Sequence, residues 1–242
     1  MSSFLFVDIE SSGLGENAAI LEIAAVPYID GEYLPHFQSY LAPHLGATLD
    51  PKAFEINGID IKSLNDFPSP SLVVKSFVDW IDSHEKVFTL IGHNVQFDKK
   101  KLYELFCRTA HYSSFVTRFR VKHICTMKMA KELFKYKKIK PEGFSLSKLC
   151  KFFNISLINA HSALPDIQAT IKLYEELKAM KVKDISTTTS MSYAEKRRKY
   201  MSIDYCTVNP EGDFYIHCKA TRDSAAMQFI LSEIYDLTVD DS

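Results

Sequence analysis

The chain has 242 residues, of which 46% are hydrophobic and 24% are charged, and its formal net charge is −1. This length is enough for one large domain, or for one domain with a small appendage. The net charge excludes the broadly basic composition typical of proteins that bind nucleic acid non-specifically. An acidic cleft that holds cations is still compatible with phosphate binding on a neutral protein.

Cysteine usage and hydropathy indicate the compartment. The five cysteines have no metal-ligand spacing, and their odd number and scattered positions indicate reduced thiols. The first apolar run, residues 4–9, is too short for a signal peptide, and no apolar stretch approaches the ~20 residues of a membrane-spanning helix. We therefore expect a soluble, cytoplasmic protein with no membrane contact.

The N-terminal part reads as strands. Apolar runs predict strands over residues 4–9, 18–29 and 33–41, and Asp30-Gly31 between the last two is a hairpin signal. These runs predict an antiparallel meander.

Helical periodicity begins near residue 69. Apolar spacing predicts helices over residues 71–83, 97–109, 127–134, 144–153 and 167–180, with short strands at 87–91 and 121–125. Strands followed by alternating helices and strands favour an α/β fold, in which helices pack against a mixed sheet.

The C-terminal part has a different character. Residues 183–192 (VKDISTTTSM) read as a linker, and beyond it the pattern indicates a helix, a hairpin over 205–208 and 213–218, and a closing helix over 224–235. We expect a main domain at residues 1–182. Residues 183–242 would form the linker and a small α+β extension, with a partner-docking surface, a substrate grip or a dimer contact as its candidate roles.

Two carboxylates end the first predicted strand. Asp8 and Glu10 are two residues apart, so in a strand both side chains project from the same face. Two like charges this close are costly unless a cation lies between them. The alternative is that the strand has already ended and both acids are solvated in a loop.

Further acids stand at the starts of two predicted helices. Asp98 follows Gly92-His93-Asn94, directly after a buried strand, where α/β proteins often bind ligands. Asp166 follows Pro165, which is best tolerated at the first helical position, and His161 precedes both in the loop. Alone, Asp98 is explained by a favourable interaction with the helix dipole, and a lone histidine such as His161 is more often structural or merely exposed than catalytic. Together, acids on three elements indicate a site for two divalent cations about 4 Å apart, with His161 as a proton acceptor.

The segments FVDIESSGL, GHNVQFDKKKL and HSALPD resemble the three motifs of the DEDDh branch of the DnaQ-like 3′–5′ exonuclease superfamily. This group includes the epsilon subunit of DNA polymerase III, RNase T and the TREX enzymes. The resemblance covers about residues 3–180. It implies an RNase H-like fold with a five-stranded mixed sheet flanked by helices, and two bound Mg²⁺ or Mn²⁺ ions.

The resemblance also implies residue roles. The metal ligands would be Asp8, Glu10, Asp98 and Asp166, with His161 as the general base. The implied substrate contacts are Ser12, Gly13, Leu14, Ile56, Asn57, Asn94 and Phe97. The family more usually has His where Asn57 stands. Phe97 would stack on the last base, or would pack in the core.

The expected function is a metal-dependent 3′–5′ exonuclease that releases nucleoside 5′-monophosphates from a 3′ end of DNA, single-stranded or frayed. One alternative is an exoribonuclease of RNase T type, because discrimination depends on contacts to the 2′-OH. Another is a nucleic-acid-binding module that has lost turnover. Three basic clusters, residues 99–101, 118–122 and 135–138, are candidates for tracking the strand or for a solvated surface. A polymerase and a second copy of the chain are candidate protein partners.

Overall fold

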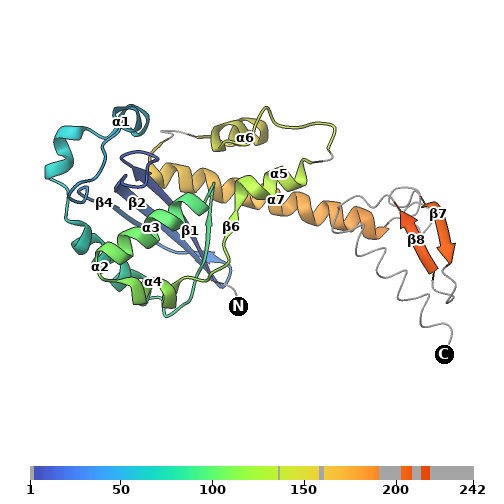
Figure 1. Cartoon of the computed structure of the whole chain (residues 1–242), viewed down its shortest axis with the longest axis horizontal. Coiled ribbons are helices and arrows are strands. Elements are labelled where there is room, and N and C mark those ends of the chain that lie inside the picture. Colours follow the sequence, from blue (N-terminus) through green and yellow to red (C-terminus); the bar gives the residue numbers. More distant parts are fainter. Residues whose placement is uncertain (1–2, 136, 158–160, 191–202, 209–213, 219–242) are drawn as a thin grey trace. The chain divides into compact units, whose positions relative to one another are not determined.

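The structure, a computed structural model, describes residues 3–135, 137–157, 161–190, 203–208 and 214–218. The chain divides into two compact units, Met1–Lys178 and Ala179–Ser242. The first unit contains the mixed sheet and the helices that pack on it (Figure 1). Among the described residues, no helix is both long and apolar enough to cross a membrane.

The sheet has the order β3-β2-β1-β5-β6, and β4 also pairs with β2. Its strands are β1 (Phe4–Ser11), β2 (Ile20–Ile29), β3 (Glu32–Tyr33), β4 (Phe37–Tyr40), β5 (Thr89–Gly92) and β6 (Ile124–Cys125). Strands β1 to β4 pair antiparallel, whereas β1, β5 and β6 run parallel. This mixed sheet confirms the fold class expected from the sequence.

The third expected strand, residues 33–41, is divided into two short strands. β3 and β4 pair with different parts of β2, on the side of β2 that β1 does not occupy. They therefore fill one edge position, and the sheet has five positions from edge to edge. Pro35 lies between them and has no backbone N–H to donate, which explains the interruption.

Helices cover both faces of the sheet. They are α1 (Pro51–Asn57), the 3-10 helix η1 (Ile61–Asn65), α2 (Pro70–Asp82), α3 (Gln96–Arg108), α4 (Tyr112–Arg118), α5 (Thr126–Leu133), α6 (Leu146–Phe153) and α7 (Ala163–Ser190). The periodicity identified α2, α3, α5, α6 and α7 but missed α1, η1 and α4. Those three are short, with five or seven residues each, so they offer little periodic signal.

The alternation of β1 assigns its side chains to two layers. Leu5, Val7 and Ile9 belong to the larger core cluster, which includes residues of α2, α3 and α4. Phe6 points to the opposite face and packs with Ala163 and Ile167 of α7. Asp8 and Glu10 follow Phe6 at the two-residue period, so they lie on the face that α7 covers.

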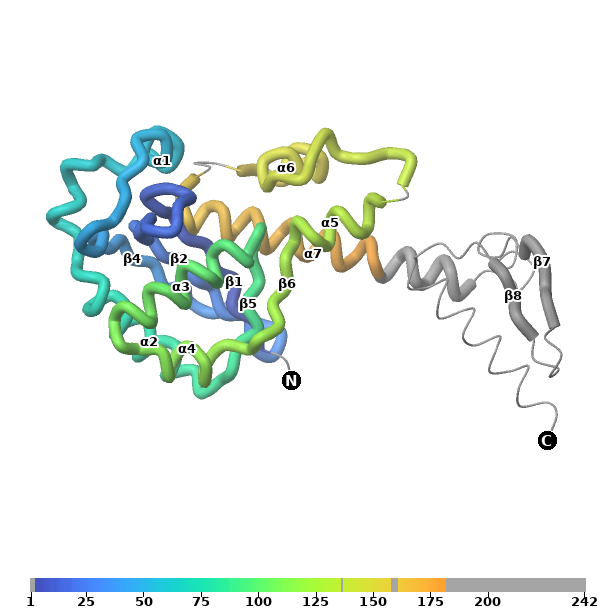
Figure 2. The backbone as a smooth tube through the Cα atoms, viewed as in Figure 1, coloured from blue at the N-terminus to red at the C-terminus, as the bar shows by residue number. Residues whose placement is uncertain are grey.

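α7 differs from its expected bounds at both ends. It begins at Ala163, before Pro165, so the proline lies within the first turn rather than at its first position. It continues to Ser190, through residues for which we expected a linker. Extending a helix costs less than starting one, because each added residue contributes a hydrogen bond to turns that already exist. In Figure 2 the earlier part of this helix is drawn in yellow to orange.

In the second unit, β7 (Ile203–Val208) pairs antiparallel with β8 (Phe214–Cys218), as the hairpin pattern predicts. The expected closing helix, 224–235, lies outside the described residues. We propose, as the sequence suggested, that residues 1–182 form the main domain and 183–242 an extension.

Candidate active site

Three carboxylates meet at the end of β1. One oxygen each from Asp8, Glu10 and Asp166 lies within 4.8 Å of the other two, and all three residues are half-buried. Asp8 and Glu10 share the α7 face of β1, and Asp166 stands in the first turn of α7. The packing of α7 on the sheet therefore brings Asp166 next to Asp8 and Glu10, which are far from it in the sequence.

Asp98 lies beside this cluster but outside it. β5 pairs only with the first three residues of β1 and ends at Gly92, so the later part of β1 has no parallel neighbour. α3 begins soon after, and the buried Asp98 side chain accepts a hydrogen bond from the Ile9 backbone N–H. Its charge also raises the pKa of Asp8, which places the two carboxyl groups close together.

His161 stands in the loop before α7, with an exposed side chain and a positive φ of 69°. Its backbone hydrogen-bonds the Asp166 carboxylate, and its imidazole charge lowers the pKa of Asp166. The histidine and the last carboxylate of the cluster are therefore neighbours, as their spacing in the sequence predicts.

Burial raises the pKa values of all four acids, and repulsion from the other carboxylates adds to the rise for Asp8 and Glu10. Burial is the largest cause in each case. The pKa of Glu10 rises from 4.5 to about 8, with further contributions from Asp166, Glu22 and Asp98. The pKa of Asp98 rises to about 7, although hydrogen bonds from its own N–H and from that of Ile9 oppose the rise. Proximity of this kind disfavours four negative charges unless a cation offsets them.

The donor set fits a divalent cation. Asp166 Oδ1 is buried and accepts no hydrogen bond, which is costly for a carboxylate oxygen. Hard cations such as Mg²⁺ take oxygen ligands and commonly use only a few protein carboxylates. Asp8, Glu10 and Asp166 would hold such an ion, with Asp98 available beside them.

Glu22 is a further buried acid of this region that the sequence analysis missed. It lies opposite Glu10 on the paired strand β2, and only 1% of its surface is exposed. Gln38 Nε2 donates to its Oε1 at 2.7 Å, and the Ala163 N–H donates to its Oε2 at 3.2 Å. The available signal was a charged residue inside the apolar run Ile20-Leu21-Glu22-Ile23.

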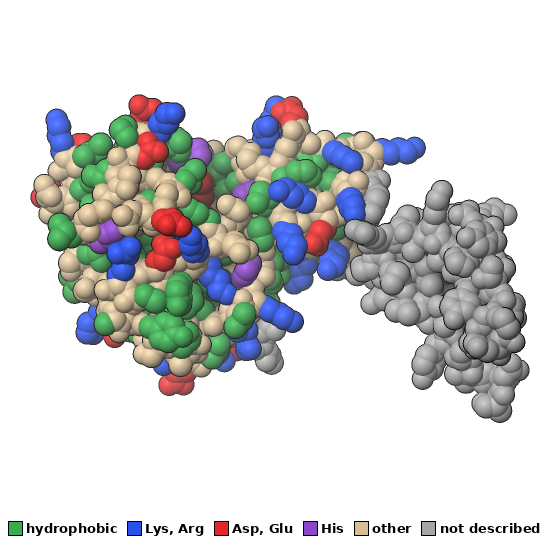
Figure 3. Space-filling view, in the orientation of Figure 1, with side chains coloured by type: hydrophobic (Ala, Val, Ile, Leu, Met, Phe, Trp, Pro, Cys, Tyr) green, Lys and Arg blue, Asp and Glu red, His purple; other side chains and the backbone are tan. Residues whose placement is uncertain are grey.

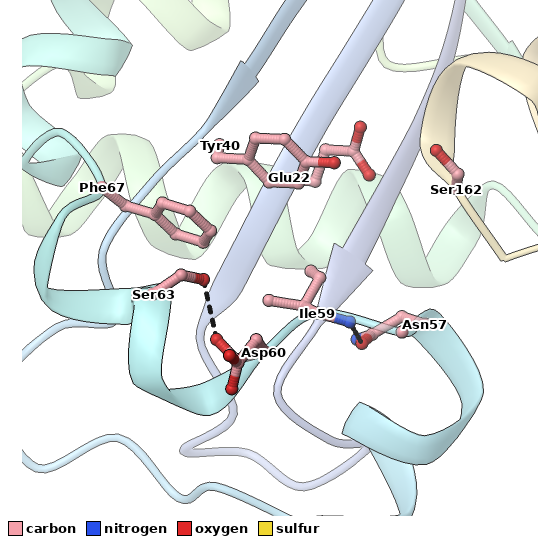
Figure 4. Close-up of a pocket in the computed structure, with 9 residues that line it drawn as sticks. Glu22, Tyr40, Asn57, Ile59, Asp60, Ser63, Phe67 and Ser162 are labelled. Atoms are coloured by element: carbon pink, nitrogen blue, oxygen red, sulfur yellow. Dashed lines mark hydrogen bonds between the residues drawn. The ribbon is translucent and has the colours of Figure 1, made fainter.

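A pocket of about 290 Å³ adjoins Glu22. The close-up in Figure 4 shows Glu22 between Tyr40 and Ser162, which is the residue after His161. The other residues that line it are Asn57, Gly58, Ile59, Asp60, Ser63 and Phe67. Of the residues predicted to contact substrate, Asn57 lines this pocket, whereas Ile56 is 58% exposed outside it.

The loop after β1 holds three more of the predicted substrate contacts. The Ser12 hydroxyl donates to the Thr48 carbonyl at 2.6 Å and accepts from the Ala19 N–H at 2.9 Å, so it stabilises the loop itself. Gly13 is buried, and Leu14 is 86% exposed. Leu14 is thus the residue of this group whose side chain is open to a ligand.

Lys101 holds the same loop from α3. Its ammonium group is buried and donates to the carbonyls of Gly15, Glu16 and Ala18 at 2.8, 3.0 and 3.1 Å. It also pairs with Glu104 at 3.3 Å. Lys101 therefore serves the fold rather than the surface, and we withdraw it from the basic clusters that were candidates for tracking a strand.

The second motif divides between exposed and packed residues. Asn94 is exposed and has a φ of 64°, and its carbonyl accepts from the Phe97 N–H. Phe97 is half-buried against the larger core cluster. His93 joins distant segments, because Nδ1 lies 2.9 Å from Thr126 Oγ1 and Nε2 lies 2.9 Å from the Phe144 carbonyl.

The family model for exonucleases of the RNase T type matches residues 5–174, which include the sheet and the carboxylate cluster. The chain therefore belongs to this exonuclease family, within the DnaQ-like 3′–5′ exonucleases. This confirms the membership that the three motifs indicated.

Several relatives are polymerases. The chain is 30% identical to the PolC-type DNA polymerase III of Bacillus cereus over 171 residues. This match covers 69% of this chain and 11% of the relative. It is also 30% identical over 176 residues to that of Bacillus subtilis, covering 71% of this chain and 11% of the relative. The chain thus spans about a tenth of the length of these relatives.

Solved structures share the fold. Escherichia coli exonuclease I in complex with a dT13 oligonucleotide matches with a TM-score of 0.63 and 19% identity, over 90% of this chain and 52% of that one. Cell-death related nuclease 4 matches with a TM-score of 0.60 and 15% identity, over 74% of this chain and 64% of that one. These similarities confirm the expected architecture.

Proposed function

We propose that this chain is a metal-dependent exonuclease that removes nucleoside 5′-monophosphates one at a time from the 3′ end of single-stranded or frayed DNA. The observation that carries the proposal is the meeting of Asp8, Glu10 and Asp166 within 4.8 Å, with Asp98 beside them. Family membership supports hydrolysis from a 3′ end.

In this proposal the cations, the carboxylates and His161 have separate roles. Two divalent cations, when bound, would supply the positive charge that activates water and stabilises the leaving oxygen. The carboxylates of β1, α3 and α7 would hold them. The His161 imidazole would accept the proton of the attacking water, since it is exposed next to Asp166 and histidine is the side chain that most often acts as a general base.

The relatives support DNA as the substrate. Curated relatives are DNA polymerases, and structural neighbours include exonuclease I bound to dT13 and dA16 oligonucleotides. The pocket beside Glu22 and the exposed Leu14 offer apolar and polar surface for the terminal nucleoside. Leu14 lies in the connection between β1 and β2, and most of the residues that line the pocket lie between β4 and α2.

Digestion of matched single-stranded DNA, duplex DNA and RNA oligonucleotides with Mg²⁺ tests the proposal. We expect mononucleotides from the 3′ end of single-stranded DNA, and no products once the metal is chelated. Asp166→Asn preserves the shape of the side chain while removing a ligand charge, so it should abolish hydrolysis and leave the circular dichroism spectrum unchanged. Faster digestion of RNA would replace the DNA assignment, and wild-type turnover by Asp166→Asn would exclude the cluster as the active site.

A further inference from the structure

The segment from α5 to α6 concentrates positive charge. Residues 126–151 contain eight lysines and two acids, whereas the whole chain has a net charge of −1. Seven of the eight lysines are exposed: Lys128, Lys131, Lys135, Lys138, Lys140, Lys148 and Lys151. We call these seven residues the lysine surface. Figure 3 shows blue side chains gathered over the part of the molecule where α5 and α6 lie in Figure 1.

Aromatic packing joins α5 and α6 beneath these lysines. The ring of Phe134, at the end of α5, lies 5.2 Å from that of Phe152 and 6.0 Å from that of Phe153, both on α6. Phe134 is buried, whereas Phe152 is 38% exposed, so the contact packs the end of α5 against α6. The lysines are left on the outer side, where a partner can reach them.

The topology places the start of this segment at the C-terminal ends of the parallel strands, which is also the end of β1 that carries Asp8 and Glu10. β6 runs parallel to β5 and β1, and α5 begins directly after it, at the carboxyl edge of the sheet. His93, which follows β5 and belongs to the second motif, contacts Thr126 at the start of α5 and Phe144 just before α6. α6 is then followed by His161 and Asp166.

We propose that the lysine surface binds the phosphate backbone of the single strand whose 3′ end lies at the carboxylate cluster. The acids repel a polyanion, so the cluster by itself cannot hold the remainder of a strand. Exposed lysines beside it would neutralise phosphates and release counterions, which is the main source of affinity for single-stranded nucleic acid. This inference deepens the proposed function and relies on it for the direction of the strand.

Oligonucleotide binding by the 242-residue chain tests the lysine surface without any turnover. The probe is a fluorescein-labelled oligothymidylate, followed by anisotropy in the presence of a chelator over a series of salt concentrations. Lys128→Gln with Lys148→Gln removes one charge from each of α5 and α6. The matched control, Lys75→Gln with Lys86→Gln, removes two charges from α2 and from the segment between α2 and β5.

The lysine surface predicts weaker binding by the first double variant and wild-type binding by the control. Each lost phosphate contact to a single strand should lower the slope of log Kd against log salt by about 0.7, so the first variant should lose about 1.4. Equal slopes for the two double variants would overturn the proposal, as would the absence of binding by the wild-type chain.

A small substrate tests hydrolysis at the carboxylate cluster independently of strand binding by the lysine surface. The p-nitrophenyl ester of thymidine 5′-monophosphate has no upstream backbone, so Lys128→Gln with Lys148→Gln should hydrolyse it at the wild-type rate and show a raised KM only for oligothymidylate. If the wild-type chain hydrolyses neither substrate, the proposed function fails. The binding measurement would still decide whether the lysine surface holds a strand.

Discussion

Glu22 lies directly across from Glu10 on the neighbouring strand, and both of its oxygens accept hydrogen bonds. The bond from the Ala163 N–H links β2 to the first residue of α7 across 141 positions of sequence. Because Asp166 and His161 flank that residue, this hydrogen bond lets Glu22 position the turn that carries both of them. Its negative charge also raises the pKa values of Asp8 and Glu10.

Glu22→Ala should therefore lower both stability and kcat. Loss of both acceptors leaves a buried N–H unpaired, at a cost of about 1–3 kcal/mol in the free energy of unfolding. Glu22→Gln is the matched control, because its amide oxygen can still accept from Ala163 while Gln38 turns its own amide to face the new N–H₂ group. Urea unfolding and oligonucleotide hydrolysis measure the two effects. Equal loss of kcat in both variants would show that the charge matters rather than the hydrogen bonds.

His161→Ala should reduce kcat by ~10²–10⁴, the range for loss of a general base. His36→Ala is the control, since His36 is also exposed but stands between β3 and β4. Single-turnover hydrolysis of oligothymidylate separates the chemical step from product release. A wild-type rate in His161→Ala would assign the proton transfer to another group.

At the scale of elements, the close approach of β1 and β5 determines where the acids can meet. A Cβ at Gly92 would lie 2.8 Å from the Val7 carbonyl oxygen and 3.0 Å from Val95 Cβ. Backbone occupies the first of these positions, so it cannot move aside as a flexible side chain would. Glycine at this point allows β5 to end against β1 and α3 to start with Asp98 turned toward Ile9.

Gly92→Ala should destabilise the protein by about 1–3 kcal/mol, the usual cost of overpacking a core. Gly15→Ala provides the control, because no atom lies within 4 Å of the added Cβ and its backbone does not require a positive φ. Denaturant unfolding at fixed pH compares the two variants. A Gly92→Ala protein as stable as Gly15→Ala would mean that the strands separate freely at this point.

At the scale of the whole molecule, the acid cluster couples stability to pH and to cations. The pKa of Glu10 is raised from 4.5 to about 8, so between these values the folded chain keeps a proton that the unfolded chain has lost. The free energy of unfolding therefore falls as the pH rises through this window. A cation that binds only the folded state opposes the loss.

In chelator, the Tm of the wild-type chain should fall relative to that of Glu10→Gln as the pH rises from 4.5 to about 8. Glu10→Gln has no carboxyl group to titrate at this position. The difference in Tm between the two proteins therefore reports the titration of Glu10. Added Mg²⁺ should raise the wild-type Tm most at the upper end of the window. A difference in Tm that is independent of pH would show that burial does not shift the pKa of Glu10.

Local patterns predicted much of this architecture. Five of the helices follow from apolar spacing, and the period-two alternation of β1 correctly placed Asp8 and Glu10 on one face. Apolar spacing did not predict the short helix α1 or the interruption at Pro35 between β3 and β4. Lys101 shows the other difficulty, because a lysine in a basic run gives no local sign that its ammonium group is buried under three carbonyls.

The sequence by itself determined the family, the order of the three motifs and which face of β1 carries the carboxylates, since these depend on residue identity and on spacing along the chain. Only the tertiary structure decided that Glu22 joins β2 to α7, that Asp98 reaches β1 where β5 ends, and that the lysines of α5 and α6 share one surface. Those relations join residues far apart in sequence, and they arise from helix packing and strand register, which no local pattern encodes.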